Sequence, residues 1–472
     1  MKPFIWDTDF HFVGKVRFYV VRAGEEVPDE VAKIVGVEPS VRSNVNIVAF
    51  VIEGGVIEPS DLKDVVRELE KVKHRIDFSK PVIVSGRGPL WLYGVLVHEL
   101  HYGKIVAVWD PRLGGGIIVE APSQNEIGKV ITISGDIEER SLGANGDIVL
   151  DLENIDGEAV LHVKIVGDRF AEPEKLRDLR CPVVSGDKIL VIEGPMPVWL
   201  ASYLALQYAH KAKAVAIFDP RLGGGVVVAS HVRGLDVGDI VKLPSKRPGQ
   251  TKIIAVLGDP NSGKSVFLHV LNDVLRQMGL KTLIQEADLT APTPHWSLFS
   301  PEVRKELKKY MKPEERLQWV IRSLESLRNS GEVDVVLADV GGGRPDLGQR
   351  ITRENLAILR YVTGAVIVTR NDKNQIASWL REIKTYFPDL KIYAILESKL
   401  KGEPVLVDGV GIVTGLDRTL YRLRAIPRGT VRVIKEVAER ILRNKYYIAR
   451  NIDISKIEQI LRDIDTARSL PA

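Results

Sequence analysis

The chain contains an internal duplication, and this limits how its first half can fold. The seven residues Asp110-Pro-Arg-Leu-Gly-Gly-Gly116 recur without change as Asp219-Pro-Arg-Leu-Gly-Gly-Gly225. Their surroundings match in the same order: a Pro-x-Trp-Leu sequence, a helical stretch, a histidine nine residues before the aspartate, and an apolar strand on either side. Because 109 residues separate the two aspartates, we predict one domain over 1–130 and a second over 135–245.

Each repeat has the pattern of a small α+β domain. The stretches 104–109 and 214–218 are short apolar strands, and 116–120 and 225–229 are the strands that return. Between them, proline fixes φ for a turn, and the glycines permit positive φ and close backbone approach. We therefore expect the aspartate and the arginine of each copy at the tip of a hairpin.

The length and composition fit a multidomain globular protein. At roughly 100–200 residues per domain, 472 residues predict two to four domains, and 45% hydrophobic with 27% charged residues exclude a disordered chain. The 66 Lys and Arg barely exceed the 62 Asp and Glu, so the whole chain is not marked as a nucleic-acid binder. A single cysteine, Cys181, a start without a secretory signal and apolar runs far below the ~20 residues of a membrane helix predict a cytoplasmic protein without a membrane segment.

A third domain with a different pattern starts at Thr251. The run 243–250 before it is polar, contains prolines and lacks periodicity, so we predict a linker there. Helical stretches then alternate with apolar strands at 253–257, 282–286, 334–338, 365–369 and 391–396. This alternation predicts an α/β domain over 251–472 with a doubly wound, mostly parallel sheet, behind two tandem α+β domains.

A phosphate-binding loop opens this third domain. The sequence Gly258-Asp-Pro-Asn-Ser-Gly-Lys-Ser265 satisfies G-x-x-x-x-G-K-[ST] after a strand and at the start of a helix, which is the context that the motif requires. Backbone N–H groups of such a loop hold phosphates, the lysine neutralises their charge, and the last serine ligates Mg²⁺. We therefore predict ATP and Mg²⁺ as cofactors, bound by Gly258, Asp259, Pro260, Asn261, Ser262, Gly263, Lys264 and Ser265.

Four further features of this domain are candidates for a functional role, and most of them also have a purely structural explanation. Asp339 ends an apolar strand and is our candidate Mg²⁺ ligand, or else caps that strand. Asp288 follows the second strand, where it would activate a phosphoryl acceptor, or else is a solvated loop residue. Arg344 follows three glycines and could meet a phosphate. The segment 418–450 holds ten Lys and Arg against two acids, which fits a solvated helix, a lid or a nucleic-acid contact.

The motifs of the repeats resemble those of a known family. Val84-Ser-Gly-Arg-Gly-Pro-Leu-Trp91, the helix with His98 and His101, and Asp110-Pro-Arg-Leu-Gly114 look like the small CRISPR-associated ring nucleases, which degrade the cyclic oligoadenylate messengers of type III systems. The resemblance implies that cyclic tetra-adenylate is bound between paired units and cut by residues from opposing faces. It also implies manganese as a candidate helper and favours a homo-oligomer.

The resemblance assigns roles position by position. In the first repeat it places the binding serine at Ser85, and the catalytic candidates at His101, Asp110 and the phosphate-contacting Arg112. Arg87 and His98 are further ring-binding candidates of this repeat. In the second repeat the catalytic candidates are His210, Asp219, Arg221 and His231.

The two repeats differ where the family pattern would make them equal. The later histidine of the family is present as His231, but the first repeat has Glu120-Ala-Pro122 there. The second repeat has Glu193-Gly-Pro-Met where the first has Ser85-Gly-Arg-Gly. If the sites are composite, the first repeat supplies Ser85 and Arg87, and the second supplies His231.

The same residues make chemical sense without the family. A cyclic RNA carries its own 2′-hydroxyl nucleophiles, so cleavage needs orientation, a proton acceptor and cations on the phosphate. Histidines exchange protons near neutral pH, arginines bind phosphate, and the aspartates orient these groups or join a histidine in holding Mn²⁺. The plainer alternative is that Asp-Pro-Arg only ties its own hairpin and that the histidines only end helices.

The attached phosphate-binding domain suggests a second reaction. Ring opening by a 2′-hydroxyl leaves linear oligoadenylate with a 5′-hydroxyl, which Lys264, Asp288 and Asp339 could phosphorylate from ATP. One alternative is an ATPase that changes the conformation or assembly of the nuclease; another is a module that binds the ring without cutting it. We expect cyclic oligoadenylate or short linear RNA as partners.

Overall fold

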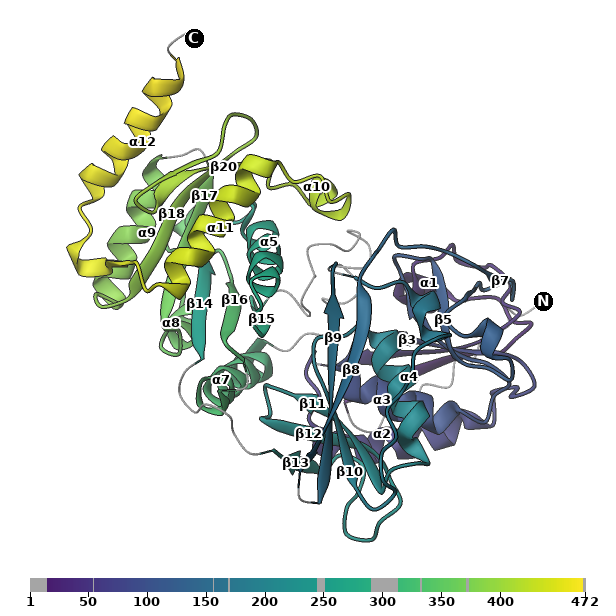
Figure 1. Cartoon of the computed structure of the whole chain (residues 1–472). Coiled ribbons are helices and arrows are strands. Elements are labelled where there is room, and N and C mark those ends of the chain that lie inside the picture. The colour runs from purple at the N-terminus through teal and green to yellow at the C-terminus, as the bar shows by residue number, and fades with distance from the viewer. Residues whose placement is uncertain are drawn as a thin grey trace. The chain divides into compact units, whose positions relative to one another are not determined.

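The structure is a computed structural model that describes residues 15–53, 55–155, 157–168, 170–243, 251–289, 313–331, 333–370 and 373–469. These residues form two compact units, one that ends at 243 and one that begins at 251 (Figure 1). The linker predicted at 243–250 lies, except for its first residue, outside the described residues.

The first unit contains one sheet for each repeat. The first sheet has the order β1-β2-β3-β4-β5-β6-β7 and the second has β13-β12-β11-β10-β9-β8. The first repeat comprises β1 (Val16–Val21), α1 (Asp29–Val35), β2 (Asn46–Ile52), α2 (Leu62–Lys73), β3 (Val82–Gly86), α3 (Leu90–Leu100), β4 (Val106–Asp110), β5 (Gly115–Glu120), β6 (Val130–Ile131) and β7 (Ile137–Glu138). The second comprises β8 (Asp147–Ile155), β9 (Glu158–Val166), β10 (Ile189–Glu193), α4 (Val198–Ala209), β11 (Ala214–Asp219), β12 (Gly224–Ser230) and β13 (Ile240–Lys242).

The two sheets share one strand arrangement. In the first, β2, β3 and β4 are parallel and β4 turns back into antiparallel β5. In the second, β9, β10 and β11 are parallel and β11 turns back into antiparallel β12. Both hairpins predicted around Asp-Pro-Arg are present, and both repeats mix helices with parallel and antiparallel strands. The α+β prediction for the first half is confirmed.

Helices α3 and α4 join the repeats. They pack against each other, and each also lies on strands of the other repeat, α3 on β11 and β12, and α4 on β4 and β5. Gly94 permits this approach, because a Cβ there would lie 2.8 Å from Cδ1 of Ile217 and 3.1 Å from Cγ1 of Val228. Apolar side chains of both repeats form a single core cluster. The repeats therefore share a core, although each has its own sheet.

The second unit is a doubly wound α/β fold. Its sheet has the order β15-β16-β14-β17-β18-β20-β19, with parallel pairing from β15 to β20, antiparallel β19, and β21 paired with β18. The strands are β14 (Lys252–Leu257), β15 (Thr282–Ala287), β16 (Val335–Val340), β17 (Gly364–Arg370), β18 (Lys391–Lys399), β19 (Val405–Val407), β20 (Val410–Thr414) and β21 (Tyr447–Ile448).

Helices cover both faces of this sheet (Figure 1). Those described are α5 (Lys264–Gln277), α7 (Pro313–Ser330), α8 (Arg353–Leu359), α9 (Lys373–Tyr386), α10 (Arg418–Arg422), α11 (Arg428–Leu442) and α12 (Ile454–Ser469). One core cluster unites the sheet with α7, α8, α9 and α12, and another unites it with α5 and α11. The predicted mostly parallel sheet is confirmed, and its strands lie within a few residues of their expected positions.

Two observations bear on the expectations from composition. In the described part of the chain, no helix is both long enough and apolar enough to cross a bilayer. Cys181 is half-buried, and burial raises the pKa of its thiol. A thiol of this kind is poorly nucleophilic at neutral pH.

Candidate functional site

Four histidines from the two repeats gather where α3 and α4 end. His98 lies in the last turn of α3, His101 and His210 are the C-cap residues of α3 and α4, and His231 follows β12. The ring centroids lie 5.2 Å apart for His98–His101, 5.7 Å for His98–His210, 5.3 Å for His101–His210 and 5.5 Å for His210–His231. The structure thus brings the three candidate catalytic histidines together with His98, and we call this group the histidine cluster.

Backbone carbonyls orient two of these rings. Nδ1 of His101 contacts the carbonyl oxygen of His98, and Nε2 of His231 lies 2.6 Å from the carbonyl oxygen of Ala209. A ring nitrogen in hydrogen-bonding contact with a carbonyl carries the proton. Nε2 of His101 and Nδ1 of His231 are therefore the nitrogens that can accept a proton while the rings are neutral.

His210 lies among the other three rings and resists protonation. Partial burial lowers the pKa of His210 below its ordinary value, and the neighbouring His101, His98 and His231 lower it further because like charges would meet. At neutral pH the His210 ring is therefore uncharged and can act as a proton acceptor.

Glu120 gives the first repeat a carboxyl group beside this cluster. Burial raises the pKa of Glu120, and the adjacent His101 and His98 oppose that increase. Glu120 ends β5, where the second repeat continues through Ser230 to His231. The difference between the repeats noted in the sequence therefore places one carboxyl group and one extra imidazole at the same cluster.

The histidine cluster does not fit a preformed manganese site. Within the described ranges, no group of three or more His, Cys, Asp or Glu side chains is arranged to hold a metal ion. The chemistry derived below for this cluster therefore uses no metal.

The other sequence candidates of the first repeat lie at the opposite edge of its sheet. His101 precedes β4 and Asp110 ends it, and five strand residues span about 13 Å. Ser85 lies near the end of β3, which runs parallel to β4, so Ser85 and Asp110 share an edge. The charges of Arg87 and Asp110 both affect the pKa of Tyr93, so both groups lie near its hydroxyl. The structure therefore separates the histidines from Ser85, Arg87, Asp110 and Arg112.

Each Asp-Pro-Arg motif stabilises its own turn. Oδ1 of Asp110 accepts hydrogen bonds from the backbone N and from Nε of Arg112, both at 2.9 Å. Oδ1 of Asp219 accepts one from the backbone N of Arg221 at 3.0 Å, and Nη1 of Arg221 lies 3.4 Å from Oδ2. Both carboxylates are buried. The aspartates therefore stand at the hairpin turns, as predicted, and their buried side chains fold back into the turns.

The corresponding edge of the second repeat is acidic. Glu193 occupies the place of Ser85 and is buried. Nδ1 of His162 lies 2.5 Å from Oε1 of Glu193, and Nε2 of His162 lies 3.0 Å from Oε2 of Glu153. Sequence reasoning missed His162 and Glu153, because they carry no motif and meet Glu193 only through strand pairing. Two carboxylates make this edge a poor place for a phosphate.

In the second unit, the phosphate-binding loop lies between β14 and α5, as predicted. Oγ of Ser265 donates a hydrogen bond of 2.8 Å to Oδ2 of Asp339, and Nζ of Lys264 donates one of 3.4 Å to the carbonyl oxygen of Asp259. Asp339 reaches the loop because β16 is the parallel neighbour of β14. A hydroxyl and a carboxylate side by side are oxygen ligands of the kind that Mg²⁺ takes.

A group of carboxyl side chains lies beside Asp339. Burial raises the pKa of Asp339, opposed by Lys264 and Ser265, and Asp288 raises it further. Burial also raises the pKa of the fully enclosed Glu286 well above its ordinary range, and Asp339 and Asp288 add to this while Arg316 opposes it. Asp288 itself is only half-buried and lies near Gly341, where a Cβ would be 3.4 Å from its Oδ1. Asp288 is therefore the accessible member of this group.

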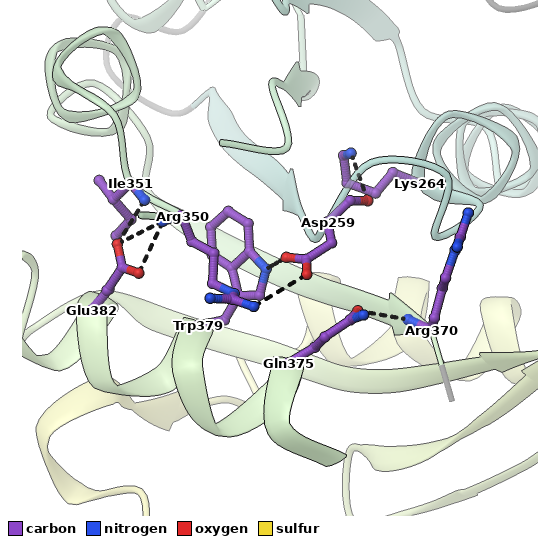
Figure 2. A network of polar contacts seen from close by, with 8 residues as sticks. All are labelled: Asp259, Lys264, Arg350, Ile351, Arg370, Gln375, Trp379 and Glu382. Atoms are coloured by element: carbon purple, nitrogen blue, oxygen red, sulfur yellow. Dashed lines mark hydrogen bonds and ion pairs between the residues drawn. The ribbon is translucent and has the colours of Figure 1, made fainter. Parts of the chain in front are cut away.

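Asp259 of the phosphate-binding loop is held from outside the loop (Figure 2). Its carboxylate accepts hydrogen bonds from Nε1 of Trp379 at 2.7 Å and from Nη2 of Arg350 at 3.3 Å. Both partners were missed in the sequence, where Arg344 was the arginine expected near a phosphate. Arg344 is exposed, whereas Arg350 contacts the loop at Asp259, and Nε of Arg370 donates a hydrogen bond of 3.0 Å to the carbonyl oxygen of Asn261 in the same loop.

The basic segment 418–450 contains an amphipathic helix, α11. The buried side of α11 carries Val433, Ile434 and Val437, while Arg432 and Lys435 are exposed. This arrangement is that of an ordinary solvated helix, which is the simplest of the three interpretations of this segment, beside a lid and a nucleic-acid contact.

Comparison with known proteins identifies the duplicated half. Residues 51–132 and 164–242 match a family of CRISPR-associated proteins, Cas_csx3. An uncharacterized protein of Aquifex aeolicus (strain VF5) is 35% identical over 96 residues, which are 20% of this chain and 84% of that protein. The chain belongs to the Cas_csx3 family through its two repeats. The matched Csx3 segments include the whole histidine cluster and both Asp-Pro-Arg turns.

Solved structures show similarity to nucleotide-binding proteins at low identity. The septum site-determining protein MinD from Pyrococcus horikoshii with Mg-ADP is 17% identical, covers 40% of this chain and 96% of its own, and has a TM-score of 0.29. Cobyrinic acid a,c-diamide synthase from Mycobacterium smegmatis with an ATP analogue and magnesium is 16% identical, covers 41% and 95%, and has a TM-score of 0.29. Similarity at this level says nothing about activity.

Proposed function

We propose that the Csx3 repeats cleave cyclic oligoadenylate, with cyclic tetra-adenylate as the expected ring, and that the second unit binds Mg-ATP and phosphorylates the 5′-hydroxyl of the linear product. The observation that carries the first part is the histidine cluster, because histidines of both repeats meet there around a neutral His210. The family of the repeats, CRISPR-associated proteins, supports the same substrate class.

The cleavage step needs only proton transfer and charge stabilisation. The 2′-oxygen of one adenosine attacks the adjacent phosphorus, and its proton passes to a neutral imidazole of the cluster such as His210. The bond from phosphorus to the 5′-oxygen breaks, and a protonated neighbouring histidine supplies a proton to that leaving oxygen. The products are a 2′,3′-cyclic phosphate and a free 5′-hydroxyl, so no oxidant, reductant or metal is required.

The separation within the first repeat supports a site shared between copies of the chain. Ser85 and Arg87 lie at the edge of the sheet opposite the histidine cluster, so one copy cannot apply both sets of residues to one phosphate. A ring lying between the Ser85 edge of one copy and the histidine cluster of the next would meet both sets. We therefore propose a head-to-tail homo-oligomer as the active assembly.

In the second unit, Asp288 favours phosphoryl transfer to a hydroxyl over a purely regulatory ATPase. Lys264 and the Ser265–Asp339 pair would hold the nucleotide phosphates and Mg²⁺, and the half-buried Asp288 stands next to Asp339 with access to an acceptor. When bound, Mg²⁺ would neutralise charge on the phosphates. Asp288 would then accept the proton of the 5′-hydroxyl.

One experiment separates the two reactions. Purified protein is incubated with cyclic tetra-adenylate and ATP labelled at the γ-phosphate, and both ends of the products are determined. We expect a linear product whose 5′ end carries the label. His210→Ala should abolish ring opening, and Lys264→Ala should leave ring opening intact but remove the label. An intact ring contradicts the nuclease, whereas label released only as free phosphate contradicts the kinase and supports an ATPase.

A further inference from the structure

Asp259 introduces a negative charge into the loop that is proposed to bind phosphates. It is the second residue of Gly258-Asp-Pro-Asn-Ser-Gly-Lys-Ser265, and its side chain is buried. An uncompensated carboxylate within a phosphate-binding loop would repel the phosphates of a nucleotide and weaken its binding by about tenfold or more. Something must therefore neutralise or turn away this charge before the loop can bind a nucleotide.

The structure supplies two partners for this charge. Nε1 of Trp379, on α9, and Nη2 of Arg350 donate hydrogen bonds of 2.7 and 3.3 Å to the carboxylate of Asp259. The Arg350 side chain is itself only 12% exposed. A buried carboxylate held by an indole N–H and a guanidinium is electrically neutral as a group.

Helix α9 holds both Asp259 and the backbone of Arg350 in place (Figure 2). Trp379 and Glu382 are three residues apart and lie on one face of the helix. While Trp379 holds Asp259, the carboxylate of Glu382 accepts hydrogen bonds from the backbone N of Arg350 at 2.9 Å and from that of Ile351 at 2.7 Å. The backbone that carries Arg350 is therefore fixed by the same helix that contacts the phosphate-binding loop.

Arg350 also belongs to the segment that follows Asp339. This segment touches the loop a second time, because a Cβ on Gly342 would lie 2.7 Å from the ring of Pro260. Arg350 therefore couples two parts of the proposed nucleotide site, the phosphate-binding loop and the chain after the candidate Mg²⁺ ligand.

We infer that Arg350 is a positioning residue for nucleotide binding, which acts by neutralising Asp259 and by tying the segment after Asp339 to the phosphate-binding loop. This inference rests on the proposed nucleotide-binding function. It assigns Arg350 no contact with the nucleotide, so the effect of losing Arg350 must depend on the charge of Asp259.

That dependence gives a test by double substitution, with Mg-ADP binding measured by calorimetry on the full chain. Arg350→Ala should weaken binding about tenfold, because the charge of Asp259 is then left unpaired. Asp259→Asn gives the reference affinity for the second step, since an amide carries no charge for Arg350 to compensate. The combined Asp259→Asn and Arg350→Ala variant should return to the affinity of Asp259→Asn. Arg381→Ala, an exposed arginine on α9, is the matched control and should have no effect.

The outcomes distinguish this inference from the function on which it rests. If the unchanged protein does not bind Mg-ADP, the nucleotide-binding proposal fails. If it binds, but the double variant is as weak as Arg350→Ala, the inference about Arg350 is wrong and the arginine acts on the nucleotide directly. Arg350→Gln, which fills similar space, replaces the alanine variant in both proteins if circular dichroism shows that Arg350→Ala does not fold.

Discussion

The indole Nε1 of Trp91 in the first repeat donates a hydrogen bond of 3.1 Å to Oδ2 of Asp219 in the second. Trp91 lies in the first turn of α3, and Asp219 ends β11 where the second Asp-Pro-Arg turn begins. The equivalent indole of the second repeat, Trp199, is equally buried, but its Nε1 has no hydrogen-bond partner within the described residues. The two tryptophans therefore have the same size and burial and differ in one hydrogen bond.

This pair predicts unequal effects of the same substitution. Trp91→Phe and Trp199→Phe both remove part of a buried ring, but only Trp91→Phe also removes a hydrogen bond to a buried carboxylate. We expect Trp91→Phe to lower the free energy of unfolding by about 1–2 kcal/mol more than Trp199→Phe. Urea unfolding followed by circular dichroism measures the difference, and equal losses would mean that the contact between the repeats contributes nothing.

The histidine cluster predicts a specific titration. Partial burial and the charges of His101, His98 and His231 lower the pKa of His210. In proton NMR, the His210 ring should titrate below the ordinary histidine range, and His101→Asn should move it upward because one of the repelling charges is gone. A His210 titration that His101→Asn does not move would contradict this account.

The lowered pKa of His210 also makes the free energy of unfolding of the first unit depend on pH in a defined direction. Because the pKa of His210 is lower in the folded state, the unfolded chain binds more protons as the pH falls through the ordinary histidine range. The first unit should therefore lose stability on acidification through that range. His210→Gln should make urea midpoints less dependent on pH there, and an unchanged pH dependence would contradict the assignment.

Sequence reasoning found what is local and missed what depends on packing between distant segments. The strands of the second unit were located because buried parallel strands are continuous apolar runs, and Lys264 and Ser265 because their motif is contiguous. Arg350 and Trp379 lie 91 and 120 residues from Asp259 and carry no motif. A signal was available in Asp259 itself, since an acidic residue inside a phosphate-binding loop needs a partner.

The distance between the histidine cluster and the residues around Asp110 has a similar cause. His101 and Asp110 are close in sequence, but an extended strand carries them to opposite edges of the sheet. Conversely, His98 and His210 are 112 residues apart and meet because α3 packs on α4, an approach that Gly94 permits. Spacing alone could not show either result.

Glu286 predicts a pH effect of opposite sign in the second unit. Burial, with Asp339 and Asp288, raises the pKa of Glu286 well above its ordinary range. The folded chain therefore keeps a proton that the unfolded chain loses, and stability falls as the pH rises above about 4.5. Glu286→Gln removes this linkage, so we expect the variant to gain stability over the unchanged protein between pH 5 and pH 8. Urea midpoints across this range measure the gain. A difference that stays constant with pH would mean that Glu286 is ionised in the folded state.

The proposed site between copies predicts that two inactive proteins restore each other. Ser85→Ala damages the edge of one sheet, and His231→Ala damages the histidine cluster at the other end, so each alone should lose most ring cleavage. In a head-to-tail assembly mixed in equal amounts, about a quarter of the sites would combine an intact edge with an intact cluster, so activity should return to that level. Mixing Ser85→Ala with Arg87→Ala is the control, because both substitutions damage the same edge and no intact site can form. Full activity in both single variants, or no recovery in the first mixture, would exclude a site shared between copies. Only in a shared site can the intact edge of the His231→Ala protein combine with the intact histidine cluster of the Ser85→Ala protein.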